Sequence, residues 1–181
     1  MSKLFESITP QLEKWISHQQ MFFVATAPLS ADGHINCSPK GLDSFRILSP
    51  TVVAYQDLTG SGIETIAHIQ ENKRILIMFC AFDGAPKIVR LHGHGKAVLP
   101  TDTAFADMET KFPKRTGVRA YIQIDLTRIT DSCGYSVPLY DFKKHRDVLD
   151  KYNEQKGEQK LKEYRLLKNK TSIDGLMGLV E

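Results

Sequence analysis

A loop of glycines and hydroxyls, residues 59–65 (TGSGIET), has the residue types that bind a phosphate. It follows an apolar run, residues 52–55, and precedes a helical pattern that begins at Ile63. Glycines let the backbone approach a ligand closely, and N–H groups at a helix start attract anions. The loop therefore predicts a cradle for a phosphorylated small molecule. A capping box between Ser61 and Glu64 explains the same residues without a ligand.

Two cations accompany this loop in the sequence. Lys40 lies in the polar run 36–41 (NCSPKG), and Arg90 lies among apolar residues of a β-type run. For Lys40, the alternative to a ligand contact is an exposed lysine in a turn. A half-buried arginine needs an anionic partner, which for Arg90 is a ligand, Asp57 or Glu64. The loop lacks the GK[ST] and GxGxxG fingerprints, so neither common nucleotide motif is present.

Other residues with reactive or charged side chains give weaker indications of function than this loop and its two cations. His92 and His94 share one face of a predicted strand but lack a third ligand, so we expect no metal site. Cys133 has no evident resolving partner, and an ordinary thiol is the simpler interpretation. The basic run 143–146 (KKHR) is typical of a solvated helix start.

Short β-type runs with brief connections must position these residues. Seven such runs predict strands at 21–29, 34–38, 45–48, 51–56, 74–82, 87–99 and 121–129. Helical patterns lie at 10–20, 63–70 and 101–111, and residues 141–168 form one or two helices broken near Gly157. Thr9 followed by Pro10 predicts the N-cap of the first helix.

The connections are too short for parallel crossovers, so the strands should be antiparallel. Closing such a sheet removes its edges, which favours a small β-barrel with peripheral helices, a mainly β protein. We expect one domain over 1–181. Residues 1–138 would form the barrel with its N-terminal helix, and residues 139–181 a helical extension packed on the barrel or on a dimer partner.

Composition excludes several classes. A net charge of +3 without a basic stripe argues against nucleic acid. The longest apolar run, residues 75–82, is too short to span a membrane, and the first residues contain no signal-peptide core. Three cysteines without a metal spacing fit reduced thiols, so we expect a cytoplasmic protein.

Taken in order, the motifs INCSPKG, DLTGSGIETIAH, ENKRILIMFCAFDG and RLHGHG resemble the pyridoxamine 5′-phosphate oxidase-related family of FMN-binding split barrels. The resemblance covers most of the chain. It implies a six-stranded antiparallel Greek-key split barrel that forms a homodimer, with FMN in each of two clefts between the subunits.

The resemblance also implies the cofactor-binding residues. Ser38, Lys40, Ser61 and Thr65 would meet the FMN phosphate, and Arg90 is a further candidate. The flavin ring would lie near Cys37, Tyr55, Gln56 and Met78. Arg146 is either part of a solvated helix start or a contact to the neighbouring subunit's flavin.

Residues 62–64 (GIE) stand where true pyridoxamine phosphate oxidases have a Ser-Arg-Lys cluster. The resemblance therefore implies a flavin-dependent oxidoreductase of this family other than a true pyridoxamine phosphate oxidase. The alternative is a non-catalytic module of the same fold that holds FMN, a deazaflavin or haem. Neither the substrate nor the catalytic residues follow from the sequence.

Overall fold

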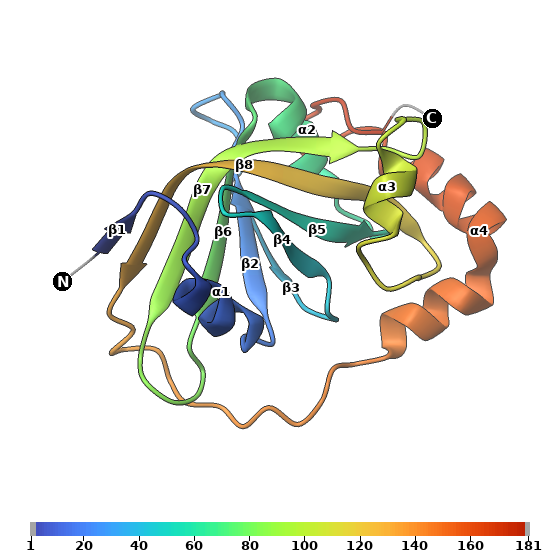
Figure 1. Ribbon diagram of the computed structural model, residues 1–181. Helices are drawn as coiled ribbons and strands as arrows, with labels where there is room; N and C mark the ends of the chain where they lie inside the picture. Colours follow the sequence, from blue (N-terminus) through green and yellow to red (C-terminus); the bar gives the residue numbers. More distant parts are fainter. Residues whose placement is uncertain (1–2, 180–181) are drawn as a thin grey trace.

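One antiparallel sheet organises residues 3–179, the part of the chain that this computed structural model describes (Figure 1). Its strands follow the order β3-β2-β6-β7-β8-β5-β4, and β1 pairs with β8. The strands are β1 (Lys3–Phe5), β2 (Phe22–Thr26), β3 (Asn36–Lys40), β4 (Phe45–Ser49), β5 (Val52–Leu58), β6 (Arg74–Cys80), β7 (Ile88–Val98) and β8 (Val118–Ser132). The helices are α1 (Pro10–Ser17), α2 (Glu64–Asn72), α3 (Phe105–Glu109) and α4 (Val148–Lys168).

The expected antiparallel split barrel with peripheral helices is confirmed, although it has eight strands. The added strand is β1, which is only three residues long and therefore carries no readable alternation. Among the described residues, β3 and β4 end the sheet and do not pair with each other. Curvature of the sheet nevertheless brings Phe22 of β2 against Phe45 of β4, with 5.2 Å between ring centroids. Side-chain packing, rather than a closed ladder, completes the barrel.

The core lies inside this curved sheet. Alternation along β2 buries every second residue, so that Phe22, Val24 and Thr26 point inward. The helix α1 adds Leu12 and Ile16 to the same core. Further fully buried members are Tyr55, Ile77, Leu91, Ile122 and Ile124. This packing holds the inner faces of β3 and β5 at fixed positions.

Two helix predictions have opposite outcomes. Thr9 caps α1 as expected, since its Oγ1 accepts a hydrogen bond from the Leu12 N–H at 3.2 Å. The predicted capping box at Ser61 is wrong, because α2 begins at Glu64, after Ile63, and no side chain of the described residues caps it. Glu64 instead accepts a 3.4 Å hydrogen bond from the backbone N–H of Ile173.

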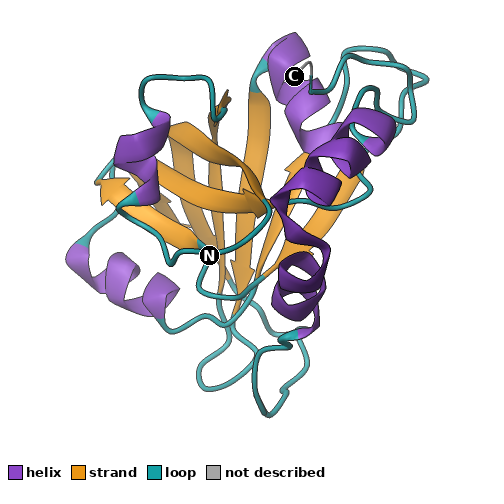
Figure 2. Cartoon of the chain, turned by 90° about the vertical axis from the view of Figure 1, so that its right-hand side faces the viewer, coloured by secondary structure: helices purple, strands orange, loops and turns teal. Residues whose placement is uncertain are grey.

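The C-terminal part runs around one end of the barrel. Residues 133–147 cross below β2 and β6 without regular structure, and α4 then lies along one side of the sheet (Figures 1 and 2). Gly157, with φ 71°, breaks α4 at the predicted position. Glu158 accepts a 2.7 Å hydrogen bond from the Gly117 N–H, and Leu161 is fully buried. No helix in the described part is both long and apolar enough to cross a bilayer.

Candidate functional site

A pocket of about 320 Å³ opens between β3, the end of β5 and the start of α2. The polar side chains that line it come from four elements, from the loop between β3 and β4, and from the loop before α2. They are Asn36, Ser38, Lys40, Ser44, Gln56, Thr59, Glu64, Thr65 and Arg119. The pocket thus combines hydroxyls, amides and two cations with one carboxylate.

Hydroxyl and amide groups on one wall form a connected network. Alternation along β3 turns Asn36, Ser38 and Lys40 to the same side. The Asn36 Nδ2 donates to Thr65 Oγ1 at 3.0 Å and to Thr26 Oγ1 at 3.2 Å. The Ser38 hydroxyl donates to Asn36 Oδ1 at 3.1 Å. The amide of Asn36 therefore fixes the positions of the Ser38 and Thr65 hydroxyls.

A buried histidine supports this network from inside the barrel. His68 is fully buried on α2, and its Nδ1 lies 2.9 Å from Thr26 Oγ1. Burial lowers the pKa of His68 against the opposing effect of nearby carboxylates, so the ring is neutral at neutral pH. Its Nε2 has no hydrogen-bond partner within the described part of the chain.

A carboxylate beneath the pocket binds both of its cations. Asp57 is 1% exposed, with Oδ2 2.7 Å from Arg119 Nε and Oδ1 3.3 Å from Lys40 Nζ. Burial by itself would raise the pKa of Asp57, but Arg119 and Lys40 together lower it, so the group is ionised. The positive charge of the pocket is therefore largely balanced before any ligand arrives.

The C-terminal region holds the glycine loop from behind. Asn169 Nδ2 donates to the carbonyl oxygens of Gly60 at 2.9 Å and Ser61 at 3.3 Å. Asn169 Oδ1 also accepts from Arg119 Nη1 at 2.9 Å. Arg165 Nη1 donates to Thr59 Oγ1 at 3.2 Å. The loop that faces the pocket is thus positioned by the end of α4.

The structure brings four of the nine predicted binding residues together. Ser38, Lys40, Gln56 and Thr65 line the pocket, and Gln56 Oε1 is buried without a partner among the described residues. Ser61 belongs to the adjoining loop, but its side chain is not part of the lining.

The other predicted residues lie elsewhere in this chain. Cys37 is exposed, since alternation along β3 turns it away from the pocket, and Tyr55 is fully buried in the core. Arg90 of β7 donates to Ser132 Oγ at 2.8 Å, and Met78 lies opposite it on β6. The binding roles of these four residues stay predictions.

Sequence reasoning missed Arg119 and the true partners of Asp57. Arg119 precedes the alternating run that marks β8, so nothing local distinguishes it. Pairing of Asp57 with Ala120 across β5 and β8 brings the two charges together.

A second, larger pocket of about 780 Å³ adjoins the first. It lies between the end of β3 and residues 140–149, and it shares Pro39, Lys40, Gly41, Leu42 and Leu149 with the smaller pocket. Within residues 3–179, no three His, Cys, Asp or Glu side chains gather as metal ligands.

Comparisons with known proteins agree with this split barrel. The family model described as pyridoxamine 5′-phosphate oxidase matches residues 8–133. The chain therefore belongs to the pyridoxamine 5′-phosphate oxidase family. A relative from Aspergillus flavus, "Pyridoxamine 5′-phosphate oxidase family protein ustO", is 40% identical over 198 residues, covering 99% of this chain and 78% of that protein.

Solved structures share the fold. A variant of the Group A Streptococcus protein HupZ is 26% identical, with a TM-score of 0.54 over 69% of this chain and 99% of that one. A protein of Mesorhizobium loti described as FAD-binding is 12% identical, with a TM-score of 0.50 over 72% and 96% of the two chains. At that identity, the second likeness concerns the fold alone.

Proposed function

We propose that this protein binds FMN and acts as a flavin-dependent oxidoreductase. The observation that carries the proposal is the convergence of Ser38, Lys40 and Thr65 at the start of α2 in one pocket. Membership of the pyridoxamine 5′-phosphate oxidase family favours a flavin, and a protein of the same fold is described as FAD-binding. We therefore prefer FMN to a deazaflavin or haem.

The donors of the pocket fit a phosphate. The Thr65 hydroxyl, the ammonium of Lys40 and the backbone N–H groups at the uncapped start of α2 all suit an anion. The Ser38 hydroxyl can join them by rotating its proton away from Asn36 Oδ1. Gly60 leaves space for a ligand, since a Cβ there would meet only the Leu58 carbonyl oxygen at 4.0 Å. Gln56 Oε1 adds a free acceptor for a donor on the ligand.

Charge balance limits how tightly this pocket holds a phosphate. Lys40 and Arg119 already share Asp57, and Glu64 adds a second carboxylate to the site. A bound phosphate would therefore compete with Asp57 for the ammonium of Lys40. This favours moderate FMN affinity, and it is the observation behind the second candidate, a non-catalytic cofactor-binding module.

When bound, the flavin would supply the redox chemistry, while the protein supplies binding and electrostatics. In this proposal Ser38, Thr65 and Lys40 hold the phosphate. Asn36 orients the two hydroxyls, and His68 positions Asn36 through Thr26. Asp57 keeps Lys40 and Arg119 in place beside the ligand.

A homodimer with FMN at the subunit interface completes the proposal. Large apolar side chains are exposed on the described surface, among them Leu139, Tyr140, Phe142 and Val148. A partner subunit would bury such residues, and it could bring Arg146 to the other subunit's cofactor. Cys37, Cys80 and Cys133 are free thiols, which suits the cytoplasm.

Replacing Lys40 tests the placement of the phosphate. We expect Lys40→Ala to weaken FMN binding by about 1.5–3 kcal/mol, the range for a hydrogen bond to a charged group. Calorimetric titration with FMN measures this loss. Lys96→Ala, which removes an exposed lysine of β7 away from both pockets, is the matched control. Equal FMN affinity in Lys40→Ala and the wild type would refute the placement.

Reduction of bound FMN distinguishes a flavin-dependent oxidoreductase from a non-catalytic cofactor-binding module. The flavin absorption band should bleach with NADPH or NADH and recover in air, with steady consumption of the nucleotide. Tight FMN binding without any nucleotide consumption would favour the non-catalytic module.

A further inference from the structure

One carboxylate of the smaller pocket has no cation as a partner. Asp57 is ion-paired with both Lys40 and Arg119. Glu64, which lines the same pocket and is half-buried, makes no ion pair with any residue in the described part of the chain. No neighbouring side chain therefore neutralises Glu64, and a ligand that enters the pocket meets its negative charge directly.

Two contacts hold the Glu64 carboxylate over the glycine loop. Its Oε1 accepts the 3.4 Å hydrogen bond from the Ile173 N–H. Its Oε2 lies against Gly62, where an added Cβ would come within 2.6 Å of it. The carboxylate needs a residue without a side chain at position 62, and Gly62 provides this. A negative group thus lies at the N-terminal end of α2, which no side chain of the described residues caps.

The C-terminal segment keeps Ile173 in place beside Glu64. Residues 171 and 177 form an antiparallel bridge, so the chain folds back on itself around Ile173. The His34 N–H donates to Asp174 Oδ2 at 2.8 Å, and His34 Nδ1 lies 2.6 Å from Asp174 Oδ1. These bonds attach the segment to the loop between β2 and β3. The position of the Glu64 carboxylate is therefore fixed by tertiary contacts as well as by its own helix.

The start of α2 is also where the proposed phosphate would bind. The N–H groups at a helix start attract any anion, including the carboxylate of a first-turn glutamate. Glu64 lines the same small pocket as Lys40 and Thr65, so a phosphate beside those two residues is repelled by a like charge. Lys40 and Arg119 are balanced by Asp57 and Glu64. These four groups together offer a phosphate no net positive charge.

We propose that Glu64 determines the charge specificity of the cofactor pocket, because its carboxylate is an internal anion that competes with the phosphate of a ligand. Attraction of the phosphate to Lys40 is offset by repulsion from Glu64. The pocket then recognises a flavin mainly through its uncharged ring and ribityl chain. The identity of the ligand rests on the proposed flavin function, whereas competition between Glu64 and an anion does not.

Two flavins that differ in one group test this specificity. Riboflavin has the ring and ribityl chain of FMN but lacks the phosphate, which is doubly charged at about pH 8. Calorimetry should show FMN bound less than about tenfold more tightly than riboflavin in the wild type. Glu64→Gln should tighten FMN by about tenfold, the scale for removing one charge beside a dianion at a partly solvated site, and leave riboflavin nearly unchanged. The FMN-to-riboflavin affinity ratio should therefore rise.

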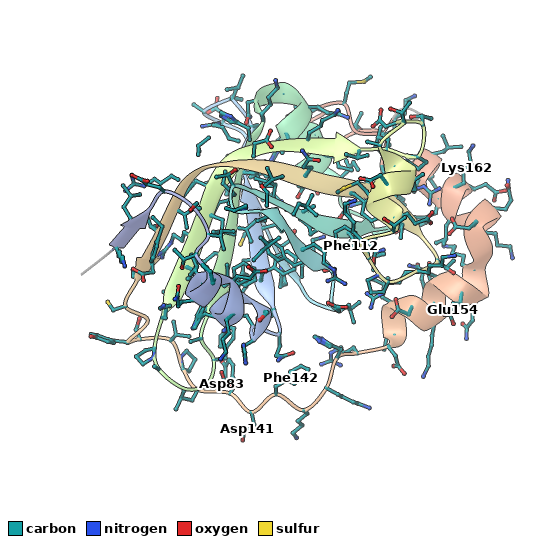
Figure 3. The ribbon with its side chains drawn as sticks, viewed as in Figure 1. Asp83, Phe112, Asp141, Phe142, Glu154 and Lys162 are labelled. Carbon is teal, nitrogen blue, oxygen red and sulfur yellow. The ribbon has the colours of Figure 1, made fainter. Side chains whose placement is uncertain are left out.

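Two further variants show that the place of the carboxylate matters. Glu154→Gln removes an exposed carboxylate from the first half of α4, away from α2, and should leave the ratio unchanged (Figure 3). Gly62→Ala keeps the charge but displaces the flexible end of Glu64, so it should raise the ratio. A steric effect of the added methyl group would act on both flavins and cancel in the ratio. Thermal melts without ligand confirm that each variant is folded.

Inorganic phosphate separates the role of Glu64 from the proposed flavin function. Added phosphate should raise the melting temperature of Glu64→Gln more than that of the wild type. If neither flavin binds but this difference is found, the flavin proposal falls and Glu64 remains a competitor for anions. A ratio that stays unchanged or falls in Glu64→Gln or Gly62→Ala would overturn the role of Glu64. Without flavin binding, equal stabilisation of both proteins by phosphate would overturn it as well.

Discussion

At the scale of single residues, Asp57 is the group on which the pocket depends. It is buried and ion-paired with Arg119, which is itself only 6% exposed. Asp57→Asn would leave that guanidinium buried without a counter-charge. We expect the variant to lose about 3–5 kcal/mol of unfolding free energy at neutral pH, as when one partner of a buried pair is removed. Urea denaturation measures this loss.

The same residue predicts a pH dependence. The pKa of Asp57 is lowered from its ordinary value of 3.8 by Arg119 and Lys40, which together outweigh burial. The ionised pair therefore contributes stability that is present above that value and is lost as the pH falls through the lower folded-state pKa. The stability difference between wild type and Asp57→Asn should shrink below about pH 4. A difference that stays constant down to pH 3 would contradict the ionised pair.

Some residues of the pocket could be predicted from the sequence, and others could not. Ser38, Lys40 and Thr65 lie in the motifs that carry the family resemblance, and that resemblance implied one common site for them, as the pocket has it. Arg119 could not be found in this way, because only the pairing of β5 with β8 brings it to Asp57.

At the scale of elements, α1 and α2 are each preceded in the sequence by a hydroxyl residue that could cap the helix, Thr9 and Ser61. Thr9 caps α1 in the structure, whereas Ser61 lies before α2 and makes no cap. Thr9→Ala should therefore cost about 1 kcal/mol of unfolding free energy, and Ser61→Ala should cost much less. Paired denaturation curves of the two variants make the comparison. An equal loss of unfolding free energy in Ser61→Ala and Thr9→Ala would show that Ser61 does cap α2.

The elements themselves were largely predictable. Seven strands show readable alternation or apolar runs, and Gly157 marks the break in α4 because a glycine readily takes the left-handed conformation found there. The short strand β1 and the uncapped start of α2 were not predictable, because tertiary contacts decide both. Strand β1 pairs with the end of β8, and Glu64 accepts a hydrogen bond from the backbone of residue 173.

At the scale of the whole molecule, the proposal requires two copies. Sedimentation equilibrium should give a mass of twice the 20.4 kDa chain. FMN affinity should fall when the protein is diluted below its dimer dissociation constant, because each site would be completed by the partner. A monomer that binds FMN equally well at every protein concentration would exclude a site at the interface.

The central claim is that this pocket holds FMN. Calorimetric titration of the purified protein with FMN, paired with its absorption spectrum, tests it most directly. The account predicts one FMN bound per chain in the titration, a flavin absorption band in the FMN-saturated protein, and weaker binding in Lys40→Ala. Protein that remains colourless and gives no binding heat with excess FMN would contradict it.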